Sequence, residues 1–252
     1  MSITTTISDG LAEVVMDAPP FNALTVAGWF ELADHLTAVG RNDEVACVIL
    51  RAEGRGFNAG VDIKEMQATE GFDALIGANK GCFAAFKAVY ECEVPVIAAV
   101  NGFCLGGGIG LVGNADIIVA ADDATFGLPE VKQGALGAAT HLARLVPQHR
   151  MREMVYTAEP ATAQELAGYG SVTRVVPSDE LLDTARELAG KITRHSRTVI
   201  RAAKESLNGI DPVDVNRSYR FEQGFTFELN LSGVSDEARD AFVEKRDADF
   251  DE

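Results

Sequence analysis

Three consecutive glycines, at 106–108, follow an apolar segment that predicts a buried strand at Val96–Val100. They open a second apolar run, which predicts a helix. Glycine is a costly residue with which to begin a helix unless another group must approach the backbone closely. The first turn of a helix carries free N–H groups and the positive end of the helix dipole. We therefore expect this helix start to point free N–H groups at a group bound above it, with a tight packing turn as the alternative.

A second glycine-rich turn, Gly54–Lys64, directly follows the strand predicted at Ala46–Arg51. Its three glycines, with Asn58 and Ala59, expose backbone N–H groups, and a helix can begin near Asp62. Such a turn can hold an anionic oxygen. The alternative interpretation is an ordinary strand-to-helix turn.

A third segment, Ala124–Glu130, places a carboxylate just past Pro129 among apolar residues. Partial burial there raises the pKa of a carboxyl group and suits it to proton transfer. The alternative is a glutamate that stabilises the start of a helix through its dipole. His141 is the histidine nearest to these three segments in the sequence.

Short apolar runs that alternate with helical patterns predict parallel βαβ units. The three middle strands are short apolar runs, as expected of strands covered on both faces. Thr25 is the expected N-cap of the first helix, and a second helical pattern spans 72–89. The strands are expected at Ala12–Met16, Ala46–Arg51, Val96–Val100, Ile117–Ala120 and Val172–Val176.

The last third of the chain predicts successive helices. Thr162 and Glu165 form the pattern of a capping box, and Ser178 is the expected cap of a helix at Asp179–Thr193. Further helices are expected at Ser196–Leu207 and Asp236–Lys245. We expect one main domain with a helical C-terminal portion.

Charge and composition exclude several functions. Among 252 residues, 22 Lys and Arg stand against 38 Asp and Glu, for a net charge of −16. Such a surface repels both nucleic acid and anionic membranes. No signal peptide or membrane-spanning run is recognisable. The four cysteines form no CxxC pair and the histidines have no zinc spacing, which favours a cytoplasmic protein with reduced thiols and no metal site.

Taken together, the motifs resemble those of the enoyl-CoA hydratase/isomerase (crotonase) superfamily. This resemblance implies an α/β fold, the crotonase (ClpP-like) spiral of ββα units, with a core at 1–195. A helical region at 196–252 would pack on the core and on neighbouring subunits of a homo-trimer or homo-hexamer. It implies an acyl-CoA substrate and no cofactor beyond the coenzyme A of that substrate. The matching segments are PPFNAL (19–24), FNAGVDIKEM (57–66), PVIAAVNGFCLGGGIGL (95–111), ATFGLPEV (124–131) and AFVEKR (241–246).

The same resemblance implies roles for particular residues. The backbone N–H groups of Val61 and Gly107 would hold the thioester oxygen and stabilise an enolate. Preorganised donors of this kind are worth about 3–4 kcal/mol each at the transition state. Phe242 and Lys245 would reach the CoA of a neighbouring subunit. Cations such as Lys64, Arg55 or Lys245 would offset the net charge toward polyanionic CoA. The resemblance also implies that the following residues bind the substrate or its CoA: Ala59, Gly60, Asp62, Ile63 and Gly106.

Two departures from the hydratase pattern bear on the reaction. Hydratases of this family carry two glutamates; Glu130 matches the second, and the first falls on Gly110. A lone glutamate fits isomerase, hydrolase or decarboxylase chemistry better, because syn hydration needs two proton-transferring groups. A shortened segment at Gly134–Leu142 places His141 beside the site. The group that activates water stays open among Glu130, His141, Asp62 and Glu222.

Three segments resemble one branch of the family more closely: the hydrolases that open ring D in steroid catabolism. Their substrate is a bicyclic indene-dione carboxyl-CoA, whose ring opens by a retro-Claisen cleavage. The alternatives are a fatty enoyl-CoA hydratase or isomerase, and a non-catalytic CoA-binding or RNA-binding relative. The segments are RGFNAGVDIKEMQATEGFDALI (55–76), GALGAATHLARLVPQH (134–149) and YRFEQGFTFELNL (219–231).

Overall fold

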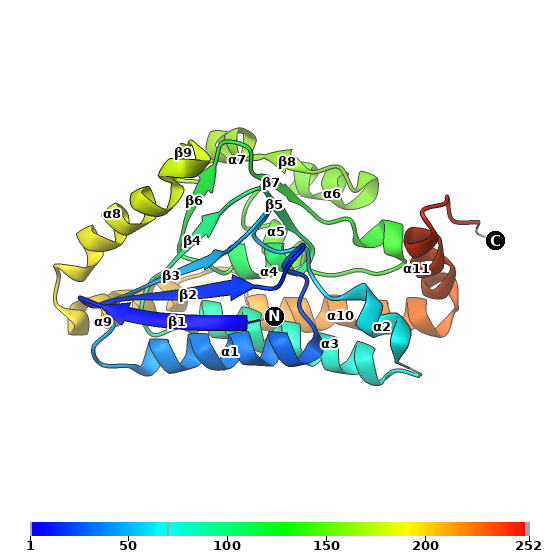
Figure 1. Ribbon diagram of the computed structural model, residues 1–252, viewed down its shortest axis with the longest axis horizontal. Helices are drawn as coiled ribbons and strands as arrows, with labels where there is room; N and C mark the ends of the chain where they lie inside the picture. Colours follow the sequence, from blue (N-terminus) through cyan, green and yellow to red (C-terminus); the bar gives the residue numbers. More distant parts are fainter. Residues whose placement is uncertain (1, 70, 250–252) are drawn as a thin grey trace.

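A six-stranded sheet forms the centre of the molecule, in the order β1-β2-β3-β4-β6-β9 (Figure 1). The structure, a computed structural model, describes residues 2–69 and 71–249, so the ends of the expected regions 1–195 and 196–252 lie partly outside the described residues. β1 runs antiparallel to β2, and every other neighbouring pair in this sheet is parallel. The strands are β1 Ser2–Ser8, β2 Leu11–Asp17, β3 Cys47–Ala52, β4 Val96–Val100, β6 Ile117–Ala121 and β9 Arg174–Val176.

The predicted strands β2, β3, β4, β6 and β9 are confirmed within one or two residues at most ends. β4 is buried along its whole length because helices and loops cover both of its faces. β1 was not predicted. Its Ser- and Thr-rich sequence shows little apolar character because it is an edge strand, and Ile3 is its one buried residue.

Helices pack against the six-stranded sheet (Figure 1). α1 (Val26–Arg41) lies along α3 (Asp73–Tyr90), and α8 (Leu181–Thr193) packs across β3, β4 and β6. Thr25 caps α1 as predicted, because its side chain accepts a hydrogen bond from the N–H of Gly28 at 3.2 Å. Trp29 and Leu36 of α1 are fully buried in the core.

A second, three-stranded sheet lies next to the first. The glycine triplet at 106–108 and the turn before Glu130 follow two of its strands. The sheet contains β5 (Phe103–Leu105), β7 (Thr125–Gly127) and β8 (Ala161–Thr162). β4, β5 and α4 (Gly107–Val112) form one ββα unit. β6, β7, the short 3₁₀ helix η1 (Glu130–Gln133) and α5 (Ala139–Leu142) form the next. The expected repetition of ββα units is therefore present.

The last part of the chain is helical, as predicted. Thr162 caps α7 through the N–H of Glu165 at 3.1 Å, but the carboxylate of Glu165 binds Arg150 instead of closing a capping box. Ser178 does not cap α8, because a 3₁₀ turn intervenes and its hydroxyl binds Asp123. The elements are α6 Gln148–Thr157, α7 Ala163–Tyr169, η2 Ser178–Glu180, α9 Arg197–Gly209, α10 Val215–Leu231 and α11 Val234–Glu244.

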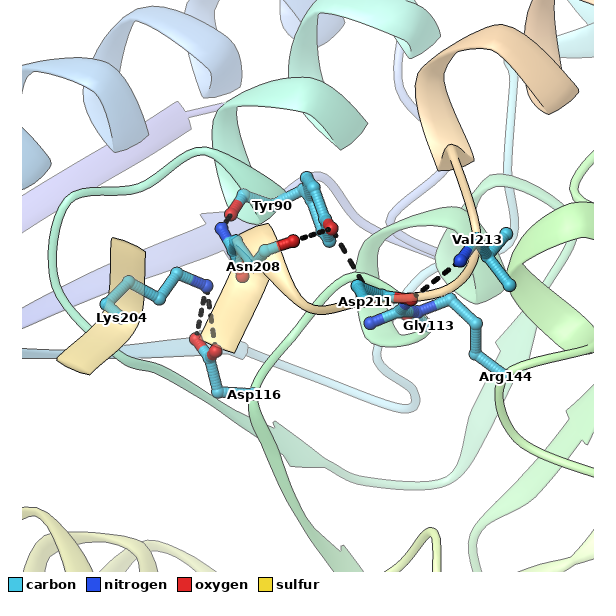
Figure 2. Close-up of polar contacts among 8 residues, drawn as sticks. All are labelled: Tyr90, Gly113, Asp116, Arg144, Lys204, Asn208, Asp211 and Val213. Atoms are coloured by element: carbon cyan, nitrogen blue, oxygen red, sulfur yellow. Dashed lines mark hydrogen bonds and ion pairs between the residues drawn. The ribbon is translucent and has the colours of Figure 1, made fainter. Parts of the chain in front are cut away.

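Polar contacts anchor α9 to the core (Figure 2). The ammonium of Lys204, with a side chain 3% exposed, contacts both carboxylate oxygens of Asp116 at 2.7 and 2.8 Å. Asn208 donates to the backbone carbonyl of Tyr90 at 2.7 Å. Just past α9, Asp211 pairs with Arg144, which also donates to the carbonyl of Gly113. These contacts fix the end of α9, and α10 begins a few residues later.

Within the described residues, no helix has the length and apolar character needed to cross a membrane. The same residues contain no group of three His, Cys, Asp or Glu side chains placed to hold a metal ion. The four cysteines are buried and unpaired, and burial raises the pKa of each thiol.

Candidate active site

The loop that ends at Val61 is held by two buried asparagines. The side chain of Asn22 donates to the backbone carbonyls of Glu53 and Gly56 at 2.7 and 2.8 Å. The side chain of Asn58 donates to the carbonyl of Asn22 at 2.6 Å and accepts from the N–H of Gly60 at 2.8 Å. The NAL and NAG triplets of the sequence thus act together, because each asparagine fixes a backbone segment that has no regular structure of its own.

The glycine triplet meets this loop. Gly60 and Gly106 adopt φ angles of +86° and +57°, a conformation that strongly favours glycine. A Cβ on Gly60 would lie 3.2 Å from the nitrogen of Gly107, and a Cβ on Gly107 would lie 2.6 Å from the ring of Trp29. The glycines are needed because the two loops and the indole approach one another this closely.

Two backbone N–H groups at this junction are candidates for binding an oxygen. Gly107 is the first residue of α4, so its N–H has no partner within the helix. Among the described residues, neither the N–H of Val61 nor that of Gly107 donates to a carbonyl outside the regular elements or to a side chain. Two such donors side by side can hold an oxygen that gains negative charge during a reaction.

A cavity of about 140 Å³ opens at these groups. Its volume is close to that of an engineered apolar cavity, about 150 Å³, that holds benzene. Seven of the predicted site residues line it: Ala59, Gly60, Val61, Ile63, Gly106, Gly107 and Glu130.

Glu130 is the one acidic residue among the described residues that line this cavity. It begins η1, and a Cβ on Gly106 would lie 2.8 Å from its Oε1. Its Oε2 is buried without a hydrogen-bond partner in the described chain. Burial, with a smaller contribution from the charge of Glu222, raises the pKa of Glu130 to about 8. A carboxylate with this pKa can accept a proton and return it near neutral pH.

The chain matches the description "Enoyl-CoA hydratase/isomerase" over residues 6–252. It belongs to the enoyl-CoA hydratase/isomerase family. It is 68% identical over 245 residues to the (7aS)-7a-methyl-1,5-dioxo-2,3,5,6,7,7a-hexahydro-1H-indene-carboxyl-CoA hydrolase of Rhodococcus jostii, covering 97% of this chain and 95% of that one. It is 65% identical to the enzyme of the same name from Mycobacterium tuberculosis, covering 97% of this chain and all of that one.

Solved structures of this family share the fold. A carnitinyl-CoA hydratase from Mycobacterium avium superposes with a TM-score of 0.85 at 30% identity, over 99% of this chain and 98% of that one. The predicted crotonase fold is confirmed by this similarity.

Two of the carboxylates considered for activating water, Asp62 and Glu222, do not line the cavity. Asp62 caps α2 (Ile63–Ala68), because its side chain accepts from the N–H of Lys64 at 2.9 Å. Glu222 caps α5, since its carboxylate accepts from the N–H groups of Ala139 and Thr140 at 2.8 and 2.5 Å. Both carboxylates are therefore engaged in holding helix starts, which argues against a role for either in activating water.

His141 also lies outside the cavity wall, against the expectation that it lies beside the site. Its ring packs between Phe86 and Tyr219, with centroids 5.1 and 5.0 Å away, and those two side chains line the cavity in its place. Burial lowers the pKa of His141 to about 3, so the ring is neutral. The physical reason is the aromatic pair, which separates the imidazole from any bound substrate.

Phe242 and Lys245 lie at the exposed end of α11 and do not line the cavity of their own chain. Their contact with the CoA of a neighbouring subunit stays a prediction. So do the roles of Val61, Gly107 and Glu130 in catalysis.

Sequence reasoning missed the polar part of the wall. Asn79 of α3, Asn230 of α10 and Arg239 of α11 line the cavity. The signal for Asn79 was present: it is a polar residue within the apolar stripe of Leu75, Ala78 and Cys82. Asn230 and Arg239 gave no such signal, because only the return of α10 and α11 brings them to the site.

Proposed function

We propose that this chain is a hydrolase that opens the five-membered ring of a bicyclic indene-dione carboxyl-CoA. The name of the two most similar relatives reported above specifies that class of substrate. One observation in the site supports a hydrolase over a hydratase: Glu130 is the sole carboxylate of the described cavity wall. Syn hydration uses two proton-transferring groups, whereas ring hydrolysis can proceed with one.

The steps balance with a single carboxylate. Glu130 accepts a proton from water while the water oxygen bonds to the carbon of the five-membered-ring ketone. The bond from that carbon to the ring junction then breaks. Its electron pair moves through the ring alkene onto the thioester oxygen, which the N–H groups of Val61 and Gly107 hold. Glu130 returns its proton to the released carbon. The other proton of water stays on the new carboxylic acid, which ionises in solution to a carboxylate, and the thioester remains intact.

The raised pKa of Glu130 suits this sequence. The same group must act first as a base and then as an acid, so a pKa near the working pH favours both steps. His141 is neutral and screened, while Asp62 and Glu222 cap helices, so Glu130 is the group best placed to activate water.

The test is turnover of the indene-dione carboxyl-CoA compared with crotonyl-CoA, followed by mass spectrometry of the acyl-CoA products. We expect the indene-dione substrate to gain the mass of one water with coenzyme A still attached. We expect crotonyl-CoA to be hydrated at least about a hundredfold more slowly. Efficient hydration of crotonyl-CoA, at the kcat/KM of about 10⁴–10⁸ M⁻¹s⁻¹ common among enzymes, would contradict the proposal.

We also propose that the chain works in the cytoplasm as a homo-trimer or homo-hexamer, with no cofactor beyond the coenzyme A of its substrate. Exposed apolar side chains on α9 and at its end support an oligomer: Val199, Leu207 and Ile210 are 63%, 61% and 75% exposed. Clustered apolar surface of this kind marks interaction sites. Sedimentation analysis tests the oligomer, and a monomer at micromolar concentration would contradict it.

A further inference from the structure

The cavity wall contains two buried side-chain polar atoms without partners among the described residues. One is the Oε2 of Glu130, an acceptor, and the other is the Nδ2 of Asn79, a donor. A buried donor without an acceptor costs free energy unless a ligand or water satisfies it. The proposed mechanism uses the acceptor and leaves the donor without a role.

The orientation of the Asn79 amide is fixed by a chain of hydrogen bonds. Arg220 can only donate, and it donates to Oε1 of Gln223 at 2.7 Å. The Nε2 of Gln223 must therefore face the other way, and it donates to the backbone carbonyl and the Oδ1 of Asn79 at 2.8 and 3.2 Å. With its Oδ1 held in this way, Asn79 keeps its Nδ2 free as a donor. Gln223 is only 2% exposed, so water does not compete for these bonds.

Several other polar residues of the wall already have partners, and the side chain of Gln133 is only partly buried. Arg239 donates to Asn230 at 2.6 Å and also pairs with Asp236. The hydroxyl of Thr226 donates to the carbonyl of Leu136 at 2.6 Å. Asn79 is thus the wall residue whose buried side-chain donor is uncommitted in the described chain.

Asn79 and Glu130 line the same cavity. Cys82 follows Asn79 by one turn of α3 and also lines it. The buried donor and the buried acceptor therefore face one cavity, and a ketone attacked by water beside Glu130 lies in the space that Asn79 also lines.

We propose that Asn79 donates a hydrogen bond from Nδ2 to the oxygen of the ring ketone that water attacks. The inference rests on the proposed ring hydrolysis, and it assigns a second oxyanion site to the same cavity. When water bonds to the ketone carbon, its oxygen becomes an alkoxide, and Nδ2 stabilises that charge. The charge returns to form the carboxyl carbonyl as the carbon–carbon bond breaks. Val61 and Gly107 hold the thioester oxygen and cannot serve this second oxygen. Gln223 is a positioning residue for Asn79.

The experiment compares two reactions of one enzyme. Ring hydrolysis needs both oxyanion sites. Exchange of the proton on the released carbon of the product with D₂O needs only Glu130 and the thioester site, because no ketone is attacked. Asn79→Ala removes the donor, while Gln223 keeps its bond to the backbone carbonyl of residue 79. Asn79→Asp keeps the shape of the side chain and also removes the donor.

We expect both variants to lower kcat for hydrolysis about 10²–10³-fold, the loss typical of one oxyanion donor, with exchange within threefold of the wild-type rate. Asn216→Ala, near the start of α10 and outside the cavity wall, where the side chain donates to Glu91, is the control and should leave both rates unchanged. A loss below about tenfold in hydrolysis, or an equal loss in both reactions, would overturn the inference. Absence of ring opening by the wild-type enzyme would instead overturn the proposed function itself.

Discussion

The ring of Phe86 occupies the space beside Gly110, so that a Cβ on Gly110 would lie 2.1 Å from Cζ of Phe86. Gly110 is the position at which the family resemblance places the first glutamate of a hydratase. This chain therefore differs from a hydratase by more than the absence of a glutamate at position 110, because the ring of Phe86 fills the space that the carboxylate would need. Phe86 also contacts Trp29, His141 and Tyr219, with centroid separations of 5.6, 5.1 and 5.1 Å.

Adding a side chain at Gly110 should destabilise the fold. We expect Gly110→Ala to lower the free energy of unfolding by about 1–3 kcal/mol, the usual cost of overpacking a core. The double variant Gly110→Ala with Phe86→Ala should lose less than the sum of the two single losses, since the smaller side chain relieves the contact. Gly110→Glu should gain no useful crotonyl-CoA hydration.

The measurement is urea unfolding of each variant. Gly190→Ala in α8 is the matched control, because a Cβ there meets nothing within 4 Å and alanine favours a helix. Equal stability of Gly110→Ala and the wild type would show that the Phe86 contact does not exclude a side chain.

Replacing Glu130 should stop turnover without unfolding the chain. We expect Glu130→Gln to lower kcat about 10²–10⁴-fold, the contribution typical of a general acid–base group, while CoA esters still bind. Steady-state kinetics and calorimetric titration of the product measure the two effects. The exposed Glu159→Gln serves as control. Near-wild-type kcat in Glu130→Gln would remove Glu130 from the mechanism.

The pKa of Glu130 predicts the pH dependence of activity. Glu130 must be deprotonated to accept a proton from water, so kcat/KM should rise with pH and level off above an apparent pKa of about 8. A profile that falls between about pH 6 and pH 8 would contradict this assignment. The profile should not show a group that titrates near the ordinary pKa of histidine, since His141 is held neutral.

The free energy of unfolding should also depend on the titration of Glu130, but it should fall as pH rises, whereas kcat/KM should rise. The pKa of Glu130 is about 8 in the folded chain, above its ordinary value of 4.5, so the folded state holds a proton that unfolding releases between these pH values. The free energy of unfolding should therefore fall as pH rises through this range. Glu130→Gln lacks this loss, so its stability relative to the wild type should increase from about pH 5 to about pH 9, as urea unfolding at each pH measures.

The ion pair between Lys204 and Asp116, which holds α9 on the core, should contribute to the free energy of unfolding (Figure 2). We expect Lys204→Met to lower the free energy of unfolding by about 3 kcal/mol, because it leaves a partly buried carboxylate without its cation. Lys191→Met, which breaks an exposed pair with Glu187, should cost less than about 0.5 kcal/mol. Equal effects of the two substitutions on thermal unfolding would show that the buried pair does not anchor α9.

How far the fold follows from the sequence depends on burial. β3, β4 and β6 could be predicted because strands covered on both faces form short, mainly apolar runs. β1 could not, since its polar side chains face solvent, and β5 and β7 are too short to show a period. α10 was not delimited because its buried face is polar at Gln223 and Thr226.

The residues of the candidate site also divide into those that the sequence predicts and those that it does not. Val61, Gly107 and Glu130 lie in local motifs whose glycines and proline can be read directly from the chain. The contacts of His141, Glu222 and Asn79 depend on α3, α5 and α10 meeting in space. No local pattern could predict that an aromatic pair screens the histidine, or that a glutamate caps a short helix.

The most direct test of the account is ring opening in H₂¹⁸O, with mass spectrometry of the product and its fragments. In the proposed mechanism Val61 and Gly107 hold the thioester oxygen, so the carbon that water attacks lies farther along the acyl group, toward Glu130. We predict one ¹⁸O in the new carboxylate, an intact thioester and no free coenzyme A. An ¹⁸O-labelled β-hydroxyacyl-CoA, or free coenzyme A that appears in step with product, would contradict the account.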